Sequence, residues 1–266
     1  MILELNDVNV HYGNIHALKE KIAALVRSVP PARELIADLV SPGDAVVLVT
    51  PIDSAAPKGR LILPQQQTIR SLLDAGCIPV VTRETELTRT LSLLREPPAL
   101  VVTDSQAFGM VSRIVPDSVR LTSFSILFAR YKGDLRTAVL GAAALRQLKD
   151  GDTVLISEGC THHRQCGDIG TEKLPRWVRQ YTGRDIRFVF TSGGEFPENL
   201  SPYALIIHCG ACMLGEREMQ SRLRRAAEQC IPVTNYGIAI AQIHGILDRA
   251  LRPFSALHAE WKKQQQ

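Results

Sequence analysis

The sequence has little of what marks membrane or nucleic-acid-binding proteins. No apolar stretch approaches the roughly 20 residues that cross a bilayer, and the start, residues 1–4, lacks the basic and apolar regions of a signal peptide. The formal net charge is only +4 and aromatic residues make up 5% of the chain, which argues against nucleic-acid binding. We therefore expect a cytoplasmic protein with neither membrane nor nucleic acid among its partners.

Several catalytic motifs are also absent. The 266 residues contain no G-x-x-x-x-G-K-[ST] string, whose backbone amides cradle phosphates in P-loop proteins, so we expect no GTP hydrolysis. There is no C-x-x-x-C-x-x-C radical-SAM motif and no G-x-S-x-G setting for a hydrolase serine. These absences predict that this sequence by itself is no enzyme.

What the sequence does contain is a regular alternation of strand and helix patterns. The near-continuous β-branched run at 44–53 predicts a strand buried on both faces, as in a parallel sheet. The alternation predicts an α/β fold with two small three-layer units, in which mainly parallel sheets are flanked by helices, and a boundary between Thr122 and Asp134. Expected strands are 44–53, 78–82, 100–104, 153–157, 186–190, 203–207 and 231–235; expected helices are 65–75, 87–94, 135–148, 175–181, 215–229 and 238–251.

The chain has six cysteines. Because disulfides are rare in the cytoplasm, clustered cysteines there indicate metal ligands or catalytic groups. Cys77 and Cys230 are isolated, and we interpret them as small buried hydrophobic residues. The other four lie in two clusters, at 160–166 and at 208–212, and each cluster follows a predicted strand. Open α/β sheets place their ligands at such strand ends.

The spacing inside the two clusters suits a metal ion. In extended chain Cys160 and His162 point to the same side, and Cys209 and Cys212 would meet on one face if they opened the following helix. Three cysteines and one histidine are compatible with a tetrahedral zinc site, and three thiolates with one weaker or exchangeable ligand are equally compatible with a 4Fe-4S cluster. The spacing does not separate the two, and cysteines and histidines without any metal are the third alternative.

Beyond the spacing, the pattern Cys-x-His, then 45 residues, then His-Cys-x-x-Cys resembles the iron–sulfur signature of the FeFe-hydrogenase maturation GTPase HydF family. The resemblance extends over about residues 21 to 253. The other segments that carry it are Ala-Pro-Lys-Gly-Arg-Leu-Ile-Leu-Pro-Gln at 56–65, Ser-Ile-Leu-Phe-Ala-Arg at 125–130, Cys-Thr-His-His at 160–163 and Leu-Pro-Arg-Trp at 174–177.

This resemblance implies three segments: an N-terminal extension at 1–20, a dimerisation domain at 21–125 and an iron–sulfur domain at 126–266. It implies a 4Fe-4S cluster on three cysteines, with a labile fourth iron position that is open to a histidine or an outside ligand. It also implies a scaffold that accepts a transient diiron precursor from radical-SAM hydrogenase maturases and delivers it to apo FeFe-hydrogenase. The scaffold itself is expected to be a homodimer. The matching ligands are Cys160, Cys209, Cys212, His162 and His208.

Two further features of the sequence are the first 19 residues and the arginines of the helix predicted at 215–229. Residues 1–19 resemble the start of a branched-chain amino acid ABC transporter ATP-binding protein, and the resemblance stops before any Walker motif. Arg222, Arg224 and Arg225 are expected on a solvated face of the helix at 215–229, with an acidic partner surface as the alternative.

Overall fold

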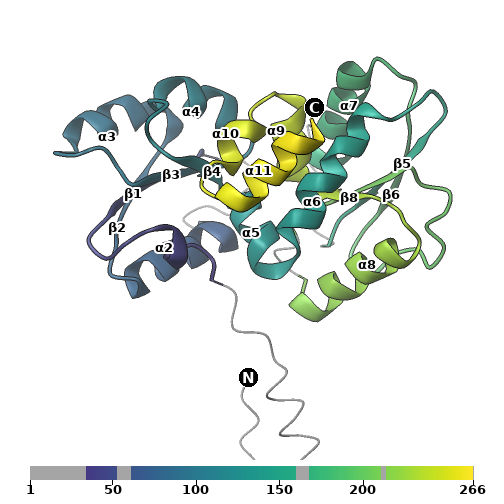
Figure 1. The fold of residues 1–266 in the computed structure, drawn as a ribbon, viewed down its shortest axis with the longest axis horizontal. Helices are drawn as coiled ribbons and strands as arrows, with labels where there is room; N and C mark the ends of the chain where they lie inside the picture. The colour runs from purple at the N-terminus through teal and green to yellow at the C-terminus, as the bar shows by residue number, and fades with distance from the viewer. Residues whose placement is uncertain (1–33, 53–60, 160–167, 211–213, 266) are drawn as a thin grey trace, which may run out of the picture. The chain divides into compact units, whose positions relative to one another are not determined.

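The structure, a computed structural model, describes residues 34–52, 61–159, 168–210 and 214–265. These residues form two four-stranded sheets with helices on both faces of each (Figure 1). Every strand pairing in both sheets is parallel. The prediction of an α/β fold with two three-layer units is therefore confirmed.

Both sheets have the same strand order. In the first it is β2-β1-β3-β4 and in the second β6-β5-β7-β8. In each sheet the earliest strand lies in the interior and the chain moves first to one side and then to the other. The strand bounds are β1 Ala45–Val49, β2 Ile78–Thr82, β3 Leu100–Thr103, β4 Leu121–Ser123, β5 Thr153–Ser157, β6 Arg187–Thr191, β7 Leu205–His208 and β8 Val233–Asn235.

This order creates a crevice at a defined place. The connections leave on opposite sides of β1 and β3 in the first sheet, and of β5 and β7 in the second. At such a switch point the loops after the two strands diverge and leave room for a ligand beyond the carboxyl ends. The second predicted cluster, 208–212, begins with His208, the last residue of β7, and Cys209 directly follows the strand.

The central strands are apolar throughout because both faces are covered. In β1, Val47 and Val49 belong to one core and Val46 and Leu48 to the other. All four side chains are fully buried, as expected for strands inside a parallel sheet. The covering helices are α2 Leu63–Asp74, α3 Leu87–Leu93, α4 Phe108–Ile114, α5 Phe124–Lys132, α6 Leu135–Gly141, α7 Leu174–Thr182, α8 Glu216–Glu228, α9 Tyr236–Ile243, α10 Leu247–Leu251 and α11 Ser255–Gln264.

Helix α9 is shared by the two sheets. Ile238 and Ala241 pack in the core on one face of the first sheet, together with residues of α10 and α11. The neighbouring residues Ala239 and Ile240 pack in the core of the second sheet. The end of the chain therefore returns to close the sheet that the beginning of the chain forms, and residues 34–266 make one compact unit.

The structure contains elements that the sequence patterns did not predict: α4, β4, α5 and α11. The segment between Thr122 and Asp134, predicted to be a boundary, carries the end of β4 and all of α5. Helix α5 is well buried because Ile126 faces one core and Leu127 the other. The helix predicted over 238–251 is broken into α9 and α10 at Gly245, whose φ of 70° ends an α-helix at low cost. No helix among the described residues is long and apolar enough to span a bilayer.

Candidate metal centre

The loops that leave β5 and β7 lie against each other. The last aligned pair of these strands is Ser157 and His208, and the Cys209 amide donates a hydrogen bond to the Ser157 carbonyl at 2.9 Å. One step further, the Gly159 amide donates to the Cys209 sulfur at 2.9 Å. Gly159, the residue before the first predicted cluster, and Cys209, in the second, therefore meet at the switch crevice.

A glycine is required where the two loops meet. A Cβ atom on Gly159 would lie 2.6 Å from Cγ of Leu214, closer than side-chain atoms approach without one of them moving. Leu214 comes two residues after Cys212 and Gly159 one residue before Cys160. The chain therefore comes close on both flanks of the predicted ligands.

Three of the predicted ligands, Cys160, His162 and Cys212, lie outside the described residues. The predicted ligands that the structure describes are Cys209 and His208. Within the described ranges no group of three or more His, Cys, Asp or Glu side chains is arranged to hold a metal ion. Cys209 is half-buried and lies on the loop, since α8 begins only at Glu216, so the condition that Cys209 opens the following helix is not fulfilled.

A buried acid–phenol pair lies beside Cys209. Glu158, only 5% exposed, accepts a hydrogen bond from the Tyr236 hydroxyl at 3.3 Å. Burial raises the pKa of Tyr236, and the nearby charges of Glu158 and Cys209 raise it further. The phenol therefore remains a protonated donor. Gly170 lies so close that a Cβ there would collide with both the Tyr236 and the Glu158 oxygens.

His208 is buried, with 1% of its surface exposed, and both ring nitrogens have partners. Nδ1 lies 2.9 Å from the carbonyl oxygen of Cys209. Nε2 lies 3.0 Å from Nη1 of Arg222. Because a guanidinium only donates, Nε2 accepts and Nδ1 carries the proton that binds the carbonyl. The prediction that His208 is a metal ligand stays a prediction, and in this conformation neither nitrogen is open.

Arg222 corrects the expectation of a solvated arginine face. It is 2% exposed and lies on the same side of α8 as the buried Met219 and Ala226. Its spacing of three and four from these residues was the signal for burial. Arg224, in contrast, is exposed as expected. Burial of Arg222 is possible because every side of the guanidinium has a partner.

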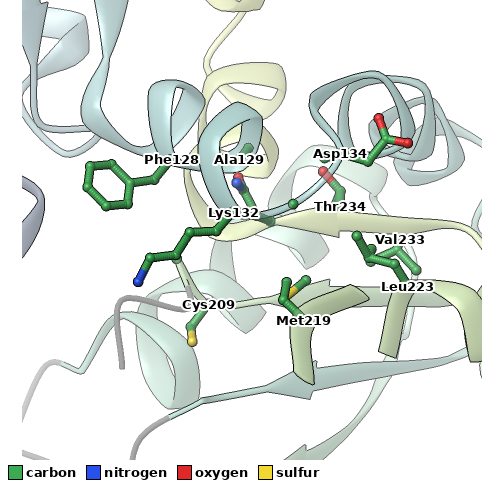
Figure 2. Close-up of a pocket in the computed structure, with 13 residues that line it drawn as sticks. Phe128, Ala129, Lys132, Asp134, Cys209, Met219, Leu223, Val233 and Thr234 are labelled. Carbon is green, nitrogen blue, oxygen red and sulfur yellow. The ribbon is translucent and has the colours of Figure 1, made fainter. Parts of the chain in front are cut away.

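A shallow groove opens next to Cys209, with a cavity volume of about 30 Å³. Figure 2 shows the Cys209 sulfur and the Lys132 side chain on the same side of this groove, with Met219 near them. Phe128 and Leu223 add to an apolar lining. The groove lies between the end of α5 and the start of α8.

Two family models match the chain. The hydrogen maturase F dimerization domain matches residues 35–133, and the hydrogen maturase F tetramerization domain matches residues 136–253. The chain belongs to the HydF family. The HydF dimerisation match covers the first sheet and α5, and the HydF tetramerisation match covers the second sheet with α9 and α10. The predicted family is confirmed, and the two names indicate a role in hydrogenase maturation and the formation of oligomers.

Other comparisons add little to the HydF assignment. No curated protein matches the chain. A solved structure of an ABC transporter solute-binding protein from Burkholderia multivorans, with an unknown ligand drawn as α-D-erythrofuranose, is 13% identical over 85% of this chain and 94% of that one. The TM-score is 0.23, and so distant a likeness carries no argument about fold or function.

Proposed function

We propose that this HydF-family chain is a scaffold in FeFe-hydrogenase maturation that carries a 4Fe-4S cluster on Cys160, Cys209 and Cys212. The observation that carries the proposal is the hydrogen bond from the Gly159 amide to the Cys209 sulfur. This bond joins Cys209 to the residue directly before Cys160, although 48 residues of chain lie between the two cysteines. Amide-to-sulfur hydrogen bonds are typical of iron–sulfur sites, where they tune the cluster.

The donor set fits such a cluster. Three thiolates leave one iron without a protein thiolate, and soft sulfur ligands suit iron–sulfur chemistry. When bound, the cluster would supply an iron with an exchangeable ligand position. His162, or a ligand from outside the chain, is the candidate for that position. A site of this kind needs reduced thiols, which supports a cytoplasmic location.

The cargo in this proposal is a diiron precursor. Radical-SAM maturases supply it and apo FeFe-hydrogenase receives it, so both are proposed partners. The groove beside Cys209 reaches Cys209 and Gly210 at the start of the second cysteine segment. GTP hydrolysis is not part of the proposal, since no P-loop string occurs in the 266 residues.

We further propose a homodimer that forms through β2. This strand is at the edge of the first sheet, and two of its apolar side chains, Ile78 and Val81, are 57% and 45% exposed. An apolar edge strand is a template for pairing with another chain. Val81→Lys should shift the protein to a monomer in analytical ultracentrifugation, whereas Leu93→Lys, at a still more exposed position on α3, should leave the dimer intact.

The second candidate is a zinc-stabilised structural or interaction module. Cys160, Cys209 and Cys212 with one histidine are an ordinary tetrahedral zinc set. Such a protein would be colourless and stable in air, and chelation would unfold it.

One experiment separates the two candidates. Wild type, Cys209→Ser and Cys230→Ser are reconstituted anaerobically with iron and sulfide, and metal content and the EPR spectrum after dithionite reduction are measured. Cys230 is exposed, contrary to the prediction that it is buried, and it lies outside both predicted clusters, so it is the matched control. The proposal expects about four irons per chain and a reduced 4Fe-4S signal in wild type and Cys230→Ser, and loss of both in Cys209→Ser. One zinc per chain without an EPR signal would instead support the structural module.

A further inference from the structure

The buried guanidinium of Arg222 joins three neighbouring strand ends. Its Nη1 donates to the Ser157 hydroxyl oxygen at the end of β5, at 3.3 Å, and to His208 Nε2 at the end of β7, at 3.0 Å. Its Nη2 donates to the carbonyl of Gly193, which follows β6, at 2.8 Å. The strand order β6-β5-β7 makes these ends adjacent, so the Arg222 side chain links the three strand ends that border the switch crevice.

The remaining contacts hold the guanidinium in place. Nε donates to Oε1 of Glu218 at 2.8 Å, one turn earlier on α8. The plane of the group lies over the Phe196 ring, 5.1 Å from its centroid. A charge this buried is tolerated only when its donors are used. Five partners on four segments of chain meet that condition, and they leave the group little freedom to move.

Arg222 acts on Cys209 through the imidazole ring of His208. Because Arg222 donates to Nε2, the proton of the neutral ring is fixed on Nδ1, where it holds the carbonyl of Cys209. Cys209 is thereby fixed at three points: its amide on Ser157, its carbonyl on His208 and its sulfur on Gly159.

We infer that Arg222 is a positioning residue for the Cys209 loop and that His208 acts as its relay: the ring holds the Cys209 backbone and does not supply a nitrogen to the metal. This inference rests on the proposed function for its purpose, since the loop is held to present a thiolate to the cluster. The network itself stands on the protein atoms alone. Its test therefore begins with protein that contains no iron.

The first measurement is the imidazole tautomer. In iron-free protein labelled with ¹⁵N-histidine, two-bond proton–nitrogen spectra distinguish a protonated Nδ1 from a protonated Nε2, and the His208→Asn spectrum assigns the His208 signals. Wild type and Arg224→Met should show His208 with the proton on Nδ1. An Nε2–H tautomer in wild type would overturn the inference.

The second measurement is the accessibility of the Cys209 thiol in the same iron-free protein. Arg222→Met should raise the rate of Cys209 alkylation about fivefold, the factor that corresponds to one lost hydrogen bond of about 1 kcal/mol. The exposed Arg224→Met on the same helix is the matched control and should leave the rate unchanged. Equal rates in all three proteins would refute the positioning role. Circular dichroism and the unfolding midpoint establish that each variant is folded, and Arg222→Lys replaces Arg222→Met if the latter is not.

The third measurement separates a relay from a ligand. Asparagine at position 208 places an N–H near the position of Nδ1, so His208→Asn keeps the donor to the Cys209 carbonyl. Glutamine reaches toward Arg222 but loses that donor. His208→Asn keeps the donor to the Cys209 carbonyl but loses the Nε2 acceptor of Arg222, so the inference expects its Cys209 to be alkylated no faster than that of Arg222→Met. His208→Gln lacks the donor to the carbonyl and should react faster still, and after reconstitution iron should be retained by His208→Asn. Equal iron loss in both variants, or a hyperfine coupling from a His208 nitrogen in the EPR of the labelled protein, would show a ligand instead. If wild type takes up no iron, the proposed function fails, and the tautomer and alkylation results still decide the inference.

Discussion

A methyl group added at Gly141 tests how tightly α6 is seated on the second sheet. Gly141 is the last residue of α6 and is buried. A Cβ atom there would lie 2.6 Å from the carbonyl carbon of Val233 in β8, and closer still to its oxygen. The obstacle is backbone inside a sheet, which has no rotamer by which to move away.

The expected cost follows from what α6 would have to do. To accept the methyl group the helix must retreat by roughly 1 Å, while its other buried residues, among them Leu135 and Val139, are packed in the core of the first sheet. Overpacking of this kind costs about 3 kcal/mol at the upper end of the usual range. The better helix propensity of alanine returns up to about 1 kcal/mol. Gly141→Ala should therefore lower the free energy of unfolding by about 2 kcal/mol, which corresponds to a fall in Tm of about 4–8 °C.

The assay is urea and thermal unfolding followed by circular dichroism, with Gly109→Ala as the control. Gly109 lies inside α4 and a Cβ there meets nothing within 4 Å, so the same chemical change should stabilise the protein by about 0.5–1 kcal/mol. The two substitutions are thus expected to have opposite signs. A Gly141→Ala protein as stable as wild type would refute the close seating of α6 on β8.

Three further predictions concern single side chains. Burial alone would raise the pKa of Asp248, but the hydrogen bond from His258 and neighbouring cations outweigh it and lower the pKa; its stabilising contribution is therefore present above the unfolded value of about 3.9 and lost as pH falls below it. Asp248→Asn should be less stable than wild type by about 1 kcal/mol or less at pH 6, and urea titrations should show this gap narrowing toward pH 3. Asn235 caps α9 by accepting a backbone hydrogen bond at 2.8 Å, so Asn235→Ala should cost about 1–2 kcal/mol in the same assay. Burial raises the pKa of the Cys77 thiol, so Cys77 should react with iodoacetamide far more slowly than the exposed Cys230, as peptide mass spectrometry would show; comparable rates would contradict the buried position.

The sequence predicted best those strands and helices whose residues follow a single hydrophobic or charge pattern. The strands 78–82 and 153–157 agree with β2 and β5 to the residue, because most of their residues are β-branched and each strand is a short apolar run. The helix predicted over 215–229 agrees with α8 within one residue at each end, since glycine and charge mark its limits.

The sequence patterns did not predict helix α5, which contributes side chains to two cores. Helix α5 carries Ile126 toward one core and Leu127 and Phe128 toward the other, so its apolar residues run together and show no helical stripe. The sequence patterns therefore do not predict this helix, whereas the predicted boundary between Thr122 and Asp134 stays a prediction. Only the packing of both neighbours reveals such a helix.

The candidate site was predicted in part. The sequence pointed to the ends of β5 and β7, and the structure brings Gly159 and Cys209 together there. The sequence did not predict that Arg222 is buried beneath the Cys209 loop, because in a sequence a buried arginine on a charged helix cannot be distinguished from a solvated one. Arg222 differs from Arg224 only in which face of α8 it occupies, and that becomes visible when the positions of Met219 and Ala226 are considered with it.

The shared helix α9 has a consequence for the order of assembly. The face of the first sheet formed by Val47, Val49 and Val101 is closed by residues as late in the chain as Leu251 and Trp261. During synthesis that face stays without its cover until nearly the whole chain has left the ribosome, at about 5–20 residues per second. The half of the protein that is made first is thus the half that is finished last, and a nascent chain halted before residue 236 would present an apolar sheet to any chaperone within reach.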